Sequence, residues 1–118
     1  MNFHQFGIVV VAKRDAGSLT EYALAFPASG GREAVMCALS EMPMGSELSF
    51  QDPTNGDCAL EAKRIGESYS VKRGCHGAYG TWRPASTQEA VAWLLPGLAH
   101  AAKHSGQGRL SVPKGDGA

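Results

Sequence analysis

The sequence lacks long hydrophobic runs and any paired-cysteine motif. No stretch approaches the ~18 consecutive apolar residues that can span a bilayer. The short apolar run at residues 6–12 is followed, rather than preceded, by basic residues, which is the reverse of a secretory signal. The three cysteines, Cys37, Cys58 and Cys75, are odd in number and show no C-x-x-C spacing. We therefore predict free, reduced thiols with no disulfide among them, and a cytoplasmic location.

An excess of charge of either sign is also absent. Eleven Lys and Arg residues balance eleven Asp and Glu residues, so the net charge creates no field that would attract nucleic acid or an anionic membrane. The two halves nevertheless differ, since residues 1–59 hold three basic and seven acidic side chains and residues 60–118 hold eight and four. We interpret this as a polarised surface that faces a partner, and we expect neither nucleic acid nor a membrane as that partner.

Length and composition predict one folded domain. A chain of 118 residues, 43% of them hydrophobic, can bury a single core. We place a single α+β domain over residues 1–104 and a Gly-rich C-terminal tail over residues 105–118, with at most a brief strand at residues 109–112.

The clearest local pattern is a β-hairpin between residues 58 and 73. With Gly66 and Glu67 at the turn, Ile65 lies opposite Ser68, and the two strands alternate between an apolar and a polar face. A slip of one residue would exchange the faces, so burial of one face fixes the register. The apolar face carries Leu60, Ala62, Tyr69 and Val71, and the polar face carries Glu61, Lys63, Ser70 and Lys72.

The remaining elements follow from apolar spacing and turn residues. The β-branched run at residues 7–12 has no alternation, which is typical of a central strand covered on both faces. Ser86 and Glu89 form a capping box that opens a helix, and we expect Pro96 to kink this helix or to end it near Leu95. Further strands are predicted at residues 19–26, 47–51 and 75–82, the last loosened by glycines, and a further helix at residues 32–42.

This order, β-β-α-β-β-β-α, predicts a two-layer α+β sandwich. The sheet is expected to be mostly antiparallel, with about five strands and both helices packed on one face. A helix, three strands and a helix is also the order of double-stranded-RNA-binding domains. Residues 87–90, however, lack the Lys-rich helix start that those domains place on phosphate.

Histidine and cysteine residues raise two hypotheses of metal binding or catalysis. His100 and His104 have a spacing that zinc sites use, but no ligand-spaced cysteine pair accompanies them, and histidines near a helix end also suit the helix dipole. Cys75 and His76 suggest an activated thiolate, but neighbouring strand residues point to opposite faces. We predict no metal site and no cofactor, and we expect binding rather than catalysis.

Aromatic and basic residues gather in the stretch that follows the hairpin, and they form the predicted binding surface. Tyr, Trp and Arg are the residue types that most often anchor protein interfaces. The leading hypothesis is a cytosolic, non-catalytic module that binds another macromolecule, with a protein as the expected partner. Under this hypothesis the chain itself neutralises or regulates its partner, as an inhibitor or immunity protein does. The candidate residues are Arg73, His76, Tyr79, Trp82 and Arg83, with Lys63, Arg64 and Lys72 on the hairpin beside them.

The alternative hypothesis is a small-molecule-binding protein or small enzyme. Its site would lie between the Gly-rich strand at residues 75–82 and the last helix, lined by Cys75, His76, Tyr79 or Trp82. A deep polar pocket there would favour this alternative, whereas an aromatic and basic patch would favour protein binding.

Overall fold

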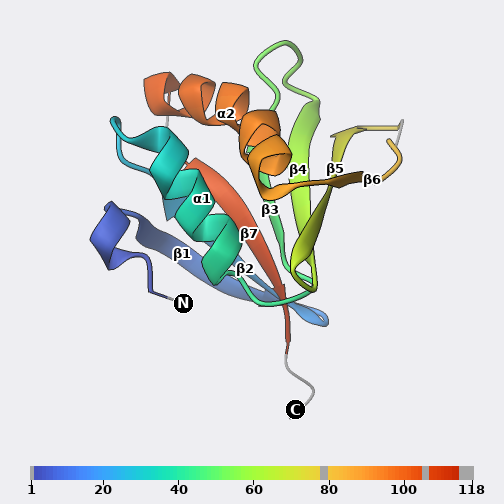
Figure 1. Cartoon of the computed structure of the whole chain (residues 1–118), viewed down its shortest axis with the longest axis horizontal. Coiled ribbons are helices and arrows are strands. Elements are labelled where there is room, and N and C mark those ends of the chain that lie inside the picture. The colour runs from blue at the N-terminus through green and yellow to red at the C-terminus, as the bar shows by residue number, and fades with distance from the viewer. Residues whose placement is uncertain (1, 78–79, 105–106, 115–118) are drawn as a thin grey trace.

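The computed structural model describes residues 2–77, 80–104 and 107–114. Within these residues, seven strands form one antiparallel sheet in the order β1-β2-β7-β3-β4-β5-β6, and two α-helices pack against it (Figure 1). The strands are β1 (Val9–Ala16), β2 (Leu19–Ala25), β3 (Glu47–Gln51), β4 (Cys58–Ile65), β5 (Ser68–Cys75), β6 (Arg83–Ala85) and β7 (Gln107–Pro113). The helices are a 3-10 turn, η1 (His4–Phe6), and the α-helices α1 (Gly31–Glu41) and α2 (Thr87–His104).

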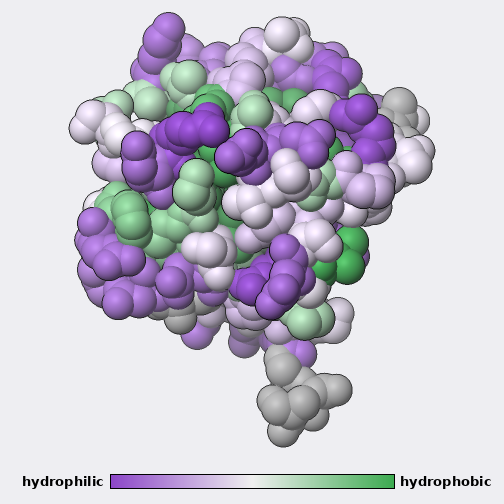
Figure 2. All heavy atoms as spheres, viewed as in Figure 1, coloured by the Kyte–Doolittle hydropathy of each residue, from purple (hydrophilic) through white to green (hydrophobic). Residues whose placement is uncertain are grey.

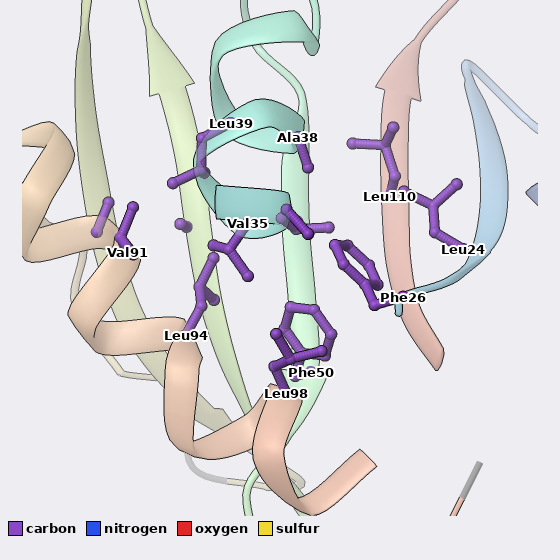
Figure 3. Close-up of a cluster of buried hydrophobic side chains, with 14 of the residues drawn as sticks. Leu24, Phe26, Val35, Ala38, Leu39, Phe50, Val91, Leu94, Leu98 and Leu110 are labelled. Atoms are coloured by element: carbon purple, nitrogen blue, oxygen red, sulfur yellow. The ribbon is translucent and has the colours of Figure 1, made fainter. Parts of the chain in front are cut away.

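Both α-helices cover the same face of the sheet, as predicted for an α+β sandwich. Figure 3 shows side chains from α1, α2 and the sheet meeting in one core, with the Phe26 and Phe50 rings packed edge to face, 5.1 Å between centroids. Tyr69 adds a polar link to this layer, because its hydroxyl donates to the Leu39 carbonyl of α1, 3.0 Å away. The predicted class is therefore confirmed, whereas the sheet has seven strands rather than about five.

The β4–β5 hairpin has the predicted register. Ile65 pairs with Ser68 and Arg64 with Tyr69, and the pairing continues outward without a shift. Gly66 occupies the turn with φ of +62°, a conformation that glycine adopts at little cost. Leu60, Ala62, Tyr69 and Val71 are all buried against the helices, as the alternation predicted.

The predictions for residues 19–26, 32–42 and 47–51 are confirmed as β2, α1 and β3. The guanidinium of Arg64 donates to the carbonyls of Ser40 and Met42, at 2.8 and 2.7 Å, and so satisfies acceptors at the C-terminal end of α1.

The position predicted for the first strand is wrong. β1 lies at the edge of the sheet and pairs only with β2, and its side chains are exposed, including Val9, Val10 and Val11. A strand that is covered on both faces is expected to be an apolar run without alternation. Such a run, however, can also form a strand that is exposed, as β1 is. The helices pack over the middle of the sheet and leave β1 uncovered (Figure 1).

The predicted C-terminal tail contributes a central strand. β7 lies between β2 and β3, and Leu110 is fully buried under the helices. Gly108 leaves room for the Phe50 ring, since a Cβ there would lie 2.6 Å from the ring. The Gly and Ser content of this segment suggested a tail, but close packing against Phe50 requires a glycine at this point.

The predicted strand at residues 75–82 is also corrected. β5 ends at Cys75, none of the described residues 76–77 and 80–82 is in a strand, and the next strand is the three-residue β6. Gly80 lies directly against the backbone of Arg73, a position that a side chain would prevent. Gly80 therefore allows the chain before β6 to lie against β5 without being a strand of the sheet.

Helix α2 begins with the predicted capping box and continues through Pro96. Ser86 N donates to Glu89 Oε1 at 3.0 Å, and Glu89 N donates to Ser86 Oγ at 3.1 Å. Figure 1 shows that α2 bends along its length, in agreement with the expected kink. No helix among the described residues combines the length and apolarity needed to cross a membrane.

Candidate functional site

One face of the sheet carries no helix, and we call it the open face. Cross-strand pairing assigns to it the residues that alternate with the buried ones. Figure 2 shows the opposite, helix side, where hydrophilic residues are spread over the surface among small hydrophobic areas. The open-face residues of the middle strands include Ala23, Glu47, Ser49, Gln51, Ala59, Glu61, Lys63, Lys72 and Arg109.

Trp82 is a large aromatic side chain beside this face, and two lysine residues lie close to its ring. Lys72 Nζ lies 4.6 Å and Lys63 Nζ 5.9 Å from its ring centroid, both within the range of a cation–π interaction. Lys72 Nζ also lies 3.9 Å from Glu61 Oε2, and these two side chains are only 18% and 22% exposed. We call Trp82, Lys63, Lys72 and Glu61 the Trp82 cluster.

Burial changes the electrostatics of this cluster. Desolvation raises the pKa of Glu61 above its ordinary value, with a further rise from Glu47, and the positive charge of Lys72 opposes both. The Glu61 carboxylate lies over Gly74, where a Cβ would be 2.5 Å from Oε2. Gly74 thus allows the Glu61 side chain to lie close to β5.

Arg83 lies on the other side of the sheet from Trp82, as alternation of neighbouring residues requires. Its guanidinium carbon is 4.9 Å from the ring centroid of Trp93 in α2, and Trp93 Nε1 donates to the Lys72 carbonyl at 3.1 Å. An open groove of about 440 Å³ lies here between β6 and α2. Its lining comprises Val71, Arg83, Pro84, Ala85, Glu89, Ala92 and Trp93.

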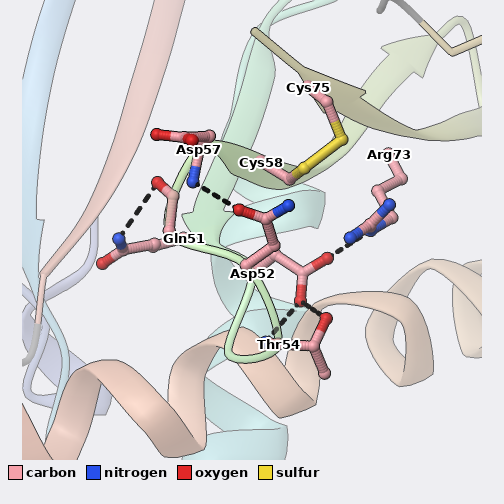
Figure 4. The surroundings of a disulfide bond; sticks show 9 residues. Gln51, Asp52, Thr54, Asp57, Cys58, Arg73 and Cys75 are labelled. Carbon is pink, nitrogen blue, oxygen red and sulfur yellow. Dashed lines mark hydrogen bonds and ion pairs between the residues drawn. A yellow bond between two sulfur atoms is a disulfide. The ribbon is translucent and has the colours of Figure 1, made fainter.

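Arg73 and His76 lie apart from the Trp82 cluster, near the loop between β3 and β4. The Arg73 guanidinium forms an ion pair with Asp52, whose other carboxylate oxygen accepts from the amide and hydroxyl of Thr54 at 2.8 and 2.7 Å (Figure 4). The Thr54 and Arg73 hydrogen bonds lower the pKa of Asp52 to about 2. His76 has an exposed side chain, and its amide donates to the Asp57 carbonyl at 3.0 Å.

Tyr79 lies outside the described residues. Of the predicted surface, the structure therefore brings Trp82 together with Lys63 and Lys72. It places Arg73 in an ion pair and Arg83 against a different tryptophan.

The prediction of three free thiols is wrong, because Cys58 and Cys75 form a disulfide (Figure 4). The two residues are directly opposed on β4 and β5, with Cα atoms 4.0 Å apart. Cys75 therefore has no free thiol that His76 could activate as a nucleophile. Stable disulfides are typical of oxidising compartments, so the cysteines no longer argue for the cytoplasm.

Cys37 is the remaining cysteine and is free and buried in α1. Burial raises the pKa of its thiol, and the nearby charge of Glu41 adds to the rise. This thiol is therefore protonated at neutral pH, unlike the depressed-pKa thiolates of catalytic cysteines.

The histidine pair of α2 lacks further ligands within the described part of the chain. His100 and His104 have ring centroids 4.5 Å apart, but the residues described include no group of three or more potential metal ligands.

Comparison of the whole chain with protein-family models, with curated proteins and with solved structures finds no match.

Proposed function

We propose that the protein is a non-catalytic binding module that contacts another protein through the Trp82 cluster on its open face. The observation that carries this proposal is a half-buried tryptophan beside two lysine ammonium groups, on a sheet face that no helix covers. A rigid aromatic side chain within a polar rim is the typical anchor of a protein interface, because it buries a large apolar area with little loss of conformational entropy.

The charges of the open face favour a protein over a nucleic acid. Lys72 is paired with Glu61 and Arg14 with Glu21, so much of the positive charge is neutralised locally. A surface that binds phosphates by charge would instead carry a clear basic excess. The charged residues of this face are Arg14, Lys63, Lys72 and Arg109, against Glu21, Glu47 and Glu61.

These contacts indicate what the partner surface offers. Lys63 and Arg109 have no carboxylate within ion-pair distance among the described residues. A partner that presents an aliphatic or aromatic group to Trp82 and a carboxylate to Lys63 would match the cluster in both shape and charge.

The groove between β6 and α2 supports the second candidate, a small-molecule site. It adjoins the last helix, where the alternative hypothesis placed such a site, and it combines the Trp93 ring with the charges of Arg83 and Glu89. It contains none of Cys75, His76 or Trp82. Because the groove and the Trp82 cluster lie on opposite sides of the sheet, substitutions separate the two candidates.

Site-specific photo-crosslinking in the source cell tests the proposed function. A photoreactive residue at position 63 should capture a discrete protein, and Trp82→Ala should remove this product and weaken the purified complex by about 2 kcal/mol, roughly 30-fold. The matched control is the same probe at Lys103, an exposed residue of α2. Equal capture from positions 63 and 103, or an affinity unchanged by Trp82→Ala, would contradict the proposal. A loss of binding on Arg83→Ala alone would favour the groove.

A further inference from the structure

The β1 edge of the sheet is long, apolar at one end and open. Val9, Val10 and Val11 are 59%, 48% and 52% exposed, and they are consecutive in the chain. β1 has eight residues and pairs with β2 alone, so the backbone groups on its outer side have no strand partner among the described residues. Such an edge can accept another strand by main-chain hydrogen bonds.

The opposite edge of the sheet is closed to strand addition. β6 has only three residues, and its central residue is Pro84, which has no backbone N–H to donate. Within residues 2–77, 80–104 and 107–114, the sheet therefore presents one edge, rather than two, on which a further strand can pair.

We infer that β1 pairs with the β1 strand of a second copy of this chain, in antiparallel orientation about a two-fold axis near Val10. This pairing would join two seven-stranded sheets into one. It involves neither the Trp82 cluster nor the helices, so it stands independently of the proposed function.

The distribution of charge along β1 favours a second copy as the occupant. The charged half of the strand already has contacts within its own chain: Arg14 pairs with Glu21 at 2.6 Å, and Lys13 Nζ lies 5.8 Å from the Tyr22 ring centroid. The valine half carries no charge. Antiparallel pairing about Val10 places valines against valines and directs the charged halves of the two copies to opposite ends.

The geometry of the edges also limits the size and strength of the assembly. Because each copy has one open edge, the contact uses the same patch on both chains and closes at two copies rather than growing into a fibre. The register of β1 against β2 shifts between Val10 and Ala12, which marks a bulge at Val11. A bulge shortens the segment that can pair, so we expect a weak dimer that depends on concentration.

Sedimentation velocity from micromolar to millimolar concentration tests this inference. The average mass of the wild-type protein should rise from one chain toward two, and Val10→Lys should remain monomeric because a lysine on the edge opposes pairing. Ile65→Lys is the matched control, since Ile65 is equally exposed, at 51%, but lies at the tip of the β4–β5 hairpin. This variant should dimerise like the wild type.

Hydrogen exchange distinguishes edge pairing from other contacts and does not depend on a variant that folds. Amides of β1 should gain protection as the wild-type concentration rises, whereas those of β6 should not. A wild-type protein that stays monomeric at millimolar concentration would overturn the inference. So would a dimer that Ile65→Lys abolishes and Val10→Lys leaves intact.

Discussion

Removal of the disulfide between Cys58 and Cys75 should measurably destabilise the fold. The two cysteines are 17 positions apart, and closing a loop of about this length in the unfolded chain contributes roughly 3 kcal/mol in the chain-entropy treatment. For a domain of about this size, that corresponds to a fall in Tm of roughly 12 °C. The two-residue turn at Gly66 and Glu67 already favours the hairpin in the unfolded chain, so the measured loss should lie at or below these figures.

Thermal unfolding of the wild-type protein with and without reductant measures this effect. The double variant Cys58→Ala/Cys75→Ala should match the reduced wild-type protein and should not respond to reductant. Thiol titration of the unfolded, unreduced protein should find one reactive thiol, that of Cys37, and three after reduction. Three thiols before reduction, or a Tm that reductant leaves unchanged, would refute the reasoning.

Two further substitutions test the packing and electrostatics around the sheet. The hydrogen bonds from Thr54 and Arg73 hold the folded-state pKa of Asp52 near 2, below its ordinary value of 3.8. The ionised carboxylate therefore stabilises the fold above pH about 4, and this contribution is lost as the pH falls toward 2. Urea unfolding across this range should show a steeper loss of stability in the wild type than in Asp52→Asn, and parallel curves would contradict the assignment. Gly97→Ala should lower the free energy of unfolding by about 1 to 3 kcal/mol in urea titrations, although helix propensity alone predicts a gain of about 1 kcal/mol. The reason is that the new Cβ would lie 2.5 Å from the Cβ of Phe50, and a stabilised variant would contradict that packing.

Local signals in the sequence predicted the elements whose contacts are close along the chain. The β4–β5 hairpin and the capping box of Ser86 and Glu89 depend on residues within a few positions of one another, and the structure has both as predicted. β3 and α1 also follow from apolar spacing within a single segment. In these elements, the pattern and the tertiary environment favour the same conformation.

Strand order could not be predicted in this way, because it depends on pairing between distant segments. β7 pairs with β2 and β3, which lie far from it in the sequence. No pattern within residues 107–113 indicates that this segment pairs between those two strands. The valine run of β1 likewise shows a preference for a strand but not its place in the sheet. The sequence suggested a tail at residues 105–118 and a central strand at residues 7–12. The strand order instead makes β7 an internal strand and β1 an edge strand.

The candidate site was predictable in part for the same reason. Trp82 lies beside Lys63 and Lys72, as the sequence analysis proposed for the hairpin and the stretch after it. Arg83 does not share that surface, because neighbouring residues in extended chain point to opposite sides of the sheet. The same alternation separates the side chains of Cys75 and His76, and for Trp82 and Arg83 it predicts two different sides of the sheet rather than one shared surface.

The disulfide was missed although the predicted register contains it. Pairing Ile65 with Ser68 and continuing outward, one residue on each strand at a time, places Cys58 directly opposite Cys75. Directly opposed residues of antiparallel strands have Cα atoms about 4.5 to 5.5 Å apart, and disulfides commonly join Cα atoms within about 4.4 to 6.8 Å. An odd cysteine count excludes only the pairing of all three residues. The register of a hairpin is therefore stronger grounds for pairing two cysteines than their number is for keeping them apart.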